Sequence, residues 1–246
     1  MSAVHPIETV FIPDGDVRAR PADLFPGTTA EQWRAHGDLV DATGRLVFAV
    51  GAFLLRAKGY LALVDLGLGE VHIDTPAGAS YRGGGLIGNL AAAGVTPDAV
   101  DLVVFTHLHR DHVGWTSTGG ALTFANARHV VHRAEWEHWH RNPSPLGPDP
   151  ATVLEPLRET VEFCADGAEI ADGLHVIETP GHTPGHISLA AGPRTVIAGD
   201  VLHSPAQLRH PHWCFGSDTD PARAAASRGR LLREYGPDVL ACGHFT

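Results

Sequence analysis

The sequence contains few cysteines, and their positions suit neither disulfides nor a thiolate metal site. Its 246 residues include three, Cys164, Cys214 and Cys242, which lie far apart and form no CxxC pair. An odd number of widely spaced cysteines argues against a disulfide framework and against a structural zinc site. Cys242 follows the apolar run DVLA and is expected in the core. We therefore predict a reduced, cytoplasmic protein with buried or idle thiols.

Long hydrophobic runs are also missing from the sequence. No apolar stretch approaches the roughly 20 residues that a membrane-spanning helix needs. The first sixteen residues, MSAVHPIETVFIPDGD, contain no basic segment followed by an apolar one, so no signal peptide is predicted. These two absences predict a protein without a membrane partner.

Positive charge is scarce as well. The 18 lysines and arginines are outnumbered by 28 aspartates and glutamates, which gives a formal net charge of -10. Such a balance disfavours binding to a nucleic-acid backbone. The count treats 17 histidines as neutral, and a bound divalent metal would offset part of the negative charge.

The chain pattern indicates one α/β domain. Its hydrophobic content of 43% suffices for a large core, and no linker divides residues 1–246, of which 1–43 are expected to form an N-terminal extension. Strands are predicted at 45–57, 60–67, 101–107, 174–180, 186–192, 194–200 and 238–244. Helices are predicted at 85–94, 151–164 and 220–235, and a strand passing into a helix at 128–140. This order favours layered sheets covered by helices.

What the sequence has in abundance is histidine, above all in THLHRDHVGW at residues 106–115. Side chains two apart in an extended segment point the same way, so His107 and His109 can present imidazoles to one point. A turn would bring Asp111 and His112 to a second point nearby. One histidine alone would be a solvated turn residue, but four ligand-type residues in six positions indicate a metal. Nitrogen and oxygen ligands suit zinc, manganese or iron, and a catalytic rather than a structural zinc site.

Three further ligand-type residues follow strand-like segments later in the chain. His182 lies in TPGHTPGH, Asp200 ends VIAGD and His244 ends LACGH. Loops at the carboxyl ends of strands carry the functional sites of α/β folds. We therefore expect these three residues to join the histidine cluster.

With these motifs the sequence resembles the metallo-β-lactamase superfamily, because HLHRDH fits the HxHxDH signature and the later ligands fall in the same order. The resemblance runs from about Arg45 to the end, and it implies a four-layer αββα sandwich with two Zn²⁺ ions, or Mn²⁺ or Fe²⁺ in their place. By position, the implied ligands are His107, His109 and His182 for the first metal, Asp111, His112 and His244 for the second, and Asp200 for both. Asp65 in LVDLG matches an aspartate that orients a ligand histidine, although Leu66 follows it where the family usually has Thr or Ser.

The resemblance implies a hydrolase. Two adjacent metals lower the pKa of a shared water from 15.7 to about 7, and the resulting hydroxide attacks a carbonyl or phosphoryl centre. Asp111 would hold this nucleophile and pass its proton on. An ester or lactone with an apolar portion is the expected small-molecule substrate. The alternatives are a glyoxalase-II-like thioesterase, a phosphotriesterase, and a metal-binding protein without turnover, which would be expected to have lost ligands.

The segment GDVLH resembles the methyl parathion hydrolase branch, which also contains lactonases and arylesterases. Acyl-homoserine lactone lactonases carry a tyrosine three residues after the bridging aspartate, whereas this chain has His203. His203 is expected either to donate a hydrogen bond to the substrate or to be a rim residue without a chemical role.

The surroundings of the site can be predicted only from closeness in sequence. Four apolar residues near the motifs are expected to wall a pocket or simply to pack in the core: Trp115, Leu202, Trp213 and Phe215. Segments 13–43 and 142–150 are predicted lids. A homodimer is a further expectation, for which the sequence indicates no surface.

Overall fold

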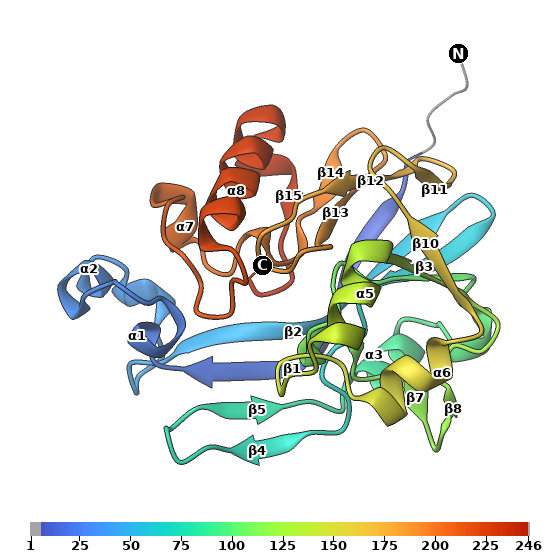
Figure 1. Cartoon of the computed structure of the whole chain (residues 1–246), viewed down its shortest axis with the longest axis horizontal. Helices are drawn as coiled ribbons and strands as arrows, with labels where there is room; N and C mark the ends of the chain where they lie inside the picture. The colour runs from blue at the N-terminus through green and yellow to red at the C-terminus, as the bar shows by residue number, and fades with distance from the viewer. Residues whose placement is uncertain (1–5, 246) are drawn as a thin grey trace.

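Two stacked β-sheets form the centre of the protein (Figure 1). The computed structural model describes residues 6–245, and within them the larger sheet has eight strands in the order β10-β9-β6-β3-β2-β1-β5-β4. It contains β1 (Glu8–Ala19), β2 (Leu46–Ala57), β3 (Tyr60–Val64), β4 (His72–Asp74), β5 (Ser80–Arg82), β6 (Leu102–Val104), β9 (Arg128–His132) and β10 (Val161–Cys164). The smaller sheet runs in the order β11 (Glu169–Ala171), β12 (Leu174–Glu178), β13 (Ile187–Ala191), β14 (Thr195–Ile197) and β15 (Leu240–Ala241). A separate hairpin pairs β7 (Ser117–Thr118) with β8 (Ala121–Leu122).

Helices cover the outer face of each sheet (Figure 1). The larger sheet is covered by α3 (Leu86–Ala92), α5 (Arg133–Arg141) and α6 (Glu155–Leu157), and the smaller one by α8 (Pro221–Tyr235). The short helix α7 (Ala206–Arg209) packs through Ala206 with Trp33 of the N-terminal helices and with residues of β2. Beyond the ends of β1 and β2 lie α1 (Pro21–Leu24) and α2 (Ala30–Arg34), while α4 (Arg110–Val113) follows β6. Single 3-10 turns occur at Gly37–Leu39, Pro97–Ala99, Gly199–Val201 and Pro237–Val239, and a π-helical turn at Pro150–Leu154.

Alternating side chains on the central strands build both cores. On β3, Ala62 and Val64 point between the sheets and pack with Leu189 of the smaller sheet. Leu63, between them, points to the outer face and packs with Leu86 of α3. Both faces of these strands are buried, which explains why their sequences are continuously apolar. The predicted four-layer αββα sandwich is thus confirmed.

The helix predicted at 151–164 is wrong for its second half. The chain forms a π-helical turn and the short helix α6, and then enters strand β10 at Val161. Pro156 lacks the N–H that a continuing helix needs. Val161–Cys164 instead pair in parallel with β9, so tertiary pairing decides the structure of this segment.

The N-terminal extension predicted at 1–43 is also corrected, and so is the lid predicted from residue 13. Residues 8–19 form β1, which pairs with β2 along its length around a bulge between Pro13 and Gly15. Proline and glycine are uncommon inside strands, and at this bulge they interrupt the strand pattern of the sequence. Residues 20–43 form short helices and loops, and residues 1–5 lie outside the described part of the chain.

Two predicted strands end earlier or are shorter than expected. The strand predicted at 60–67 ends at Val64, because Asp65 adopts a left-handed backbone conformation with φ of 63°. The strand predicted at 238–244 is confined to Leu240–Ala241. In both places the chain leaves the sheet just before a residue of the expected site.

Two of the three cysteines are buried, as expected for Cys242. Burial raises the pKa of the Cys164 thiol to about 11 and that of the Cys242 thiol to about 12. Both thiols are therefore protonated and unreactive near neutral pH. Within residues 6–245, every helix is too short or too polar to cross a bilayer.

His129 on β9 makes the stability of the fold dependent on pH. Its ring is fully buried beside Phe105, and neither ring nitrogen has a hydrogen-bond partner within the described chain. Burial lowers the pKa of His129 to about 4, against about 6.5 in an unfolded chain. Below pH 6.5 the unfolded state therefore binds a proton on His129, whereas the folded state binds it only near pH 4. The free energy of unfolding should fall as the pH drops from 6.5 towards 4, by up to about 3 kcal/mol.

Urea unfolding at about pH 7 and about pH 4.5 measures this loss. The free energy of unfolding of His129→Leu should fall by about 2.5 kcal/mol less than that of the wild type between these two pH values. His175→Gln, at a half-exposed position on β12, is the control and should lose as much as the wild type. An equal loss in the His129 variant would contradict the prediction.

Candidate metal centre

The loops that follow four strands bring the expected ligands together at one end of the sandwich. The larger sheet contributes the segment after β6, and the smaller sheet contributes the segments after β12, β14 and β15. The residues that converge there are His107, His109, Asp111, His112, His182, Asp200 and His244.

Three histidines and one aspartate form what we call the first group: His107, His109, His182 and Asp200. His109 Nδ1 lies 3.0 Å from His107 Nε2 and 2.9 Å from His182 Nε2. Asp200 Oδ2 lies 3.3 Å from His182 Nε2 and 3.6 Å from His107 Nε2. Four donor atoms therefore surround one point.

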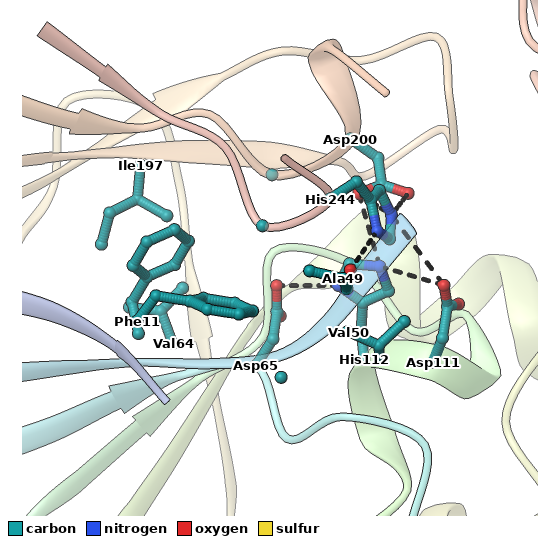
Figure 2. Close-up of a pocket in the computed structure, with 14 residues that line it drawn as sticks. Phe11, Ala49, Val50, Val64, Asp65, Asp111, His112, Ile197, Asp200 and His244 are labelled. Carbon is teal, nitrogen blue, oxygen red and sulfur yellow. Dashed lines mark hydrogen bonds and ion pairs between the residues drawn. The ribbon is translucent and has the colours of Figure 1, made fainter. Parts of the chain in front are cut away.

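The second group consists of Asp111, His112 and His244. Figure 2 shows these side chains turned toward one another, with Asp200 beside them. Asp111 Oδ2 lies 3.7 Å from His112 Nε2 and 3.9 Å from His244 Nε2. Asp200 Oδ1 lies 3.3 Å and 3.1 Å from the same two nitrogens. Asp200 Oδ2 also lies 3.3 Å from His244 Nε2. The Asp200 carboxylate thus lies between the two groups and contacts histidines of both.

Asp65 orients the second group from behind (Figure 2). Its Oδ2 lies 2.8 Å from His112 Nδ1, which is the contact expected for it. The same carboxylate accepts hydrogen bonds from the backbone N–H and the hydroxyl of Thr106, at 2.8 and 2.7 Å. A partner on one ring nitrogen fixes the tautomer and leaves the other nitrogen free to act as a ligand.

Two supporting residues have no counterpart among the sequence-based expectations. Asp218 Oδ1 lies 2.9 Å from His182 Nδ1, and nothing in the sequence distinguishes Asp218 from Asp220 in SDTD. His186 Nε2 accepts a hydrogen bond from the backbone N–H of Asp200 at 2.9 Å. The repeated PGH in TPGHTPGH was the available signal for His186.

The charge states of the first group follow from burial and from its carboxylates. Burial holds the pKa of His107 and His109 well below the usual value, so both rings are neutral. Burial also acts against a proton on His182, but hydrogen bonds to Asp200 and Asp218 outweigh it and raise its pKa to about 9. Burial disfavours the charge on Asp200, yet the surrounding histidines keep its pKa well below the usual range.

The donor atoms fit a pair of metal ions. His112 Nε2 is buried and has no hydrogen-bond partner within residues 6–245, while it faces two carboxylates. Imidazole nitrogens and carboxylate oxygens, with no thiolate among them, are a donor set of catalytic zinc. A cation between the groups would satisfy these atoms.

His203 does not line the cavity, contrary to the first of the two expectations for it, that it donates a hydrogen bond to the substrate. Its side chain is 1% exposed, and its ring stacks on Phe215 with centroids 3.7 Å apart. Its Nε2 lies 3.2 Å from Asp200 Oδ2. Phe215 lines the cavity in its place, so His203 can support Asp200 but is covered on the substrate side.

An open cavity of about 500 Å³ ends on the two groups. Its floor includes His109, Asp111, Asp200 and His244. Most of its walls are apolar and are formed by Val17, Leu24, Phe48, Leu68, Val71, Ile73, Tyr81, Pro145, Leu146 and Phe215. Asp23, Arg110, Gly216 and Ser217 also line it. Both segments that were predicted as lids contribute side chains to these walls, among them Leu24 and Leu146.

Of the four residues predicted to wall a pocket, Phe215 lines this cavity and the other three do not. Trp115, Leu202 and Trp213 are buried in the cores instead. Trp115 also donates a hydrogen bond from its indole to Asp14 at 2.8 Å. Closeness to the motifs in sequence did not show on which side of the backbone these side chains lie.

An αββα sandwich with a cluster of histidines and aspartates at one end defines a metal-dependent hydrolase. Residues 46–244 match the family model of the metallo-beta-lactamase superfamily, and the chain belongs to this superfamily. The predictions of this family and of a metal-dependent hydrolase are thereby confirmed.

Two known proteins with similar sequences have names that place them in the same superfamily or among lactonases. The chain is 32% identical over 200 residues to metallo-beta-lactamase domain-containing protein 1 of Xenopus laevis, covering 79% of this chain and 74% of that protein. It is 28% identical over 225 residues to an N-acyl homoserine lactonase of a Bacillus species, covering 85% and 83%.

Solved structures share the fold. The dizinc quorum-quenching lactonase AidC, in complex with a product N-hexanoyl-L-homoserine, superposes with a TM-score of 0.81 at 21% identity over 98% of this chain and 91% of that one. The hydrolase AbOPH superposes with a TM-score of 0.81 at 24% identity over 100% and 91%.

Proposed function

We propose that the protein is a dinuclear zinc hydrolase that cleaves lactones or esters with an apolar portion. The observation that carries this proposal is the mainly apolar cavity whose floor is made of residues from both ligand groups. A reactive ester placed on this floor would have its apolar portion against walls such as Phe48 and Leu68. Burial of such a portion favours binding by about 0.8 kcal/mol for each CH₂ group.

The relatives favour an oxygen ester in a ring. Several curated relatives are N-acyl homoserine lactonases. A lactone with an acyl chain has the two parts that this cavity accommodates, a compact reacting group and an apolar extension. This chemistry supports the lactone as the first substrate class to test.

In the proposed reaction the first metal would be held by His107, His109 and His182, the second by Asp111, His112 and His244, and both by Asp200. A bound pair of metal ions supplies polarisation of the substrate carbonyl and acidification of water. The apolar walls exclude bulk water and so strengthen the electrostatic interactions on the floor.

Asp111 is suited to move the proton. Its side chain is 26% exposed and lies on the cavity floor. Its Oδ2 faces His112 and His244, which leaves Oδ1 to accept a proton from the attacking water and return it to the leaving oxygen.

Metal content and substrate preference test the proposal together. We expect two zinc ions per chain, loss of activity on chelation and its return with zinc, and the highest kcat/KM for a lactone or aryl ester. Lengthening the apolar chain of the substrate should lower KM. A preference for thioesters or phosphotriesters would assign one of these alternative reactions to the protein. Two manganese or iron ions in place of zinc would assign the alternative metal. A full metal load without turnover of any substrate would indicate a metal-binding protein.

A further inference from the structure

We propose that Glu135 of α5 is a positioning residue that sets the affinity of the first metal by holding together the two loops that carry its ligands. The inference rests on the proposed two-metal site. The pattern RAEWEHWH presents Glu135 as an ordinary helical acid. In the structure it is completely buried, and its carboxylate is turned toward the metal loops rather than toward solvent.

The Glu135 carboxylate accepts three hydrogen bonds. Oε1 accepts from the backbone N–H of Leu108 at 3.0 Å and from the Trp139 indole at 2.6 Å. Oε2 accepts from the backbone N–H of Gly185 at 3.1 Å. Each oxygen thus serves a different loop, and every partner is a donor.

The two backbone contacts lie inside the ligand segments. Leu108 stands between His107 and His109, so fixing its amide restrains both histidines. Gly185 belongs to the turn that presents His182, whose Nε2 lies 2.9 Å from His109 Nδ1. The first segment follows β6 of the larger sheet and the second follows β12 of the smaller one. One carboxylate therefore connects the ligands of the first group across the two sheets.

The close approach at Gly185 depends on the absence of a side chain. A Cβ added there would lie 2.2 Å from the backbone nitrogen of Glu135. Trp139, one turn further along α5, adds a second contact, because its ring lies 5.4 Å from that of His109. Helix α5 thus supports the first group through both its carboxylate and its indole.

The second group is held by other contacts. His112 is oriented by Asp65, and His244 Nδ1 lies 2.9 Å from the carbonyl oxygen of Ala49. Glu135 makes no hydrogen bond to these residues within the described chain. A substitution that weakens the hydrogen bonds of Glu135 should therefore lower the affinity for the first metal and leave the affinity for the second metal unchanged.

Glu135→Gln tests the inference, because an amide keeps the shape of the side chain but has a single acceptor oxygen. Its NH₂ group must then face the N–H of Leu108 or Gly185. We expect affinity for the first zinc to fall about 10- to 100-fold, the usual effect of losing a residue that orients ligands, with affinity for the second zinc unchanged. Calorimetric titration of zinc into metal-free protein, with a competing chelator, measures both steps.

Glu137→Gln is the matched control, because Glu137 lies on the same helix, is partly exposed and pairs with Arg141. It should bind both zinc ions as the wild type does. Wild-type affinity for both ions in Glu135→Gln, or equal weakening of both, would overturn the inference. Wild-type protein that binds fewer than two zinc ions would overturn the proposed function, and the inference with it.

Glu135→Asp protects the test against a folding defect. Aspartate keeps the carboxylate but is one methylene shorter, so it should reach one of the two loops and not both. We therefore expect the affinity for the first zinc to fall and the affinity for the second to stay unchanged, as in Glu135→Gln. Circular dichroism of the metal-free proteins reports the fold. Unfolding of both Glu135 variants while Glu137→Gln stays folded would overturn the inference, since Glu135 would then act on folding rather than on one metal.

Discussion

Asp200→Ala is expected to remove both metals together and to lower kcat/KM at least about 10⁴-fold, equivalent to about 5.4 kcal/mol. The reason is the position of its carboxylate between the groups, with Oδ2 facing His182 and Oδ1 facing His112 and His244. The variant would leave five histidines and Asp111 around a buried space with one carboxylate in place of two.

Elemental analysis and kinetics on the preferred ester measure this effect, and circular dichroism confirms the fold. The hydrogen bond from the backbone N–H of residue 200 to His186 does not need the side chain, so the loop should persist. Asp238→Ala, at an exposed position shortly before His244 in the chain, serves as control and should keep two metals and full turnover. Near-normal turnover of metal-depleted Asp200→Ala would refute the proposed reaction.

Asp14→Asn is expected to cause the largest loss of stability among single substitutions that keep the side-chain shape. Asp14 is buried, and its Oδ2 accepts from the backbone N–H groups of Leu68 and Gly69 at 2.7 and 3.0 Å. Its Oδ1 accepts from three donors: Gly84 N at 3.1 Å, Leu86 N at 2.9 Å and Trp115 Nε1 at 2.8 Å. One side chain thereby ties β1 to the loop after β3, to the start of α3 and to the loop after α4.

An asparagine at this position must turn its NH₂ group toward at least two of these donors. A buried donor without an acceptor costs about 1–3 kcal/mol, so the loss should reach about 3–5 kcal/mol, a large part of a domain's total stability. Urea unfolding followed by tryptophan fluorescence measures it. Asp16→Asn on the same strand removes a partly exposed pair with Arg18 and should cost less than about 1 kcal/mol. Equal losses of unfolding free energy in the two variants would show that the five hydrogen bonds of Asp14 contribute no more to stability than one partly exposed ion pair.

The sequence predicted the ligand cluster because its chemistry is concentrated locally. Four ligand-type residues occupy six positions after an apolar strand, and the remaining three follow short apolar runs. The supporting residues could not be found in this way. Glu135 acts on amides 27 and 50 positions away, and Asp14 acts on donors from 54 to 101 positions away.

The errors in the fold have the same origin. Residues 161–164 follow a stretch with helical spacing, and it is pairing with β9 that makes them a strand. Residues 1–43 were predicted as an extension, yet residues 8–19 form a strand that continues on both sides of a bulge near Asp14. One of the two expectations for His203 placed it at the substrate because it lies three residues after Asp200, whereas in the structure the ring of Phe215 stacks on it and covers it.

The division of the ligands between the two sheets has a consequence for folding. The first group combines His107 and His109 from the larger sheet with His182 from the smaller one, and the second combines His112 with His244 in the same way. Each ion would therefore act as a cross-link between two layers that otherwise adhere through apolar packing and through hydrogen bonds such as those of Glu135. A metal ion that binds the folded chain and does not bind the unfolded chain adds its binding free energy to the stability of the fold. Metal supply would then govern how long the two layers stay together as well as whether the site can turn over.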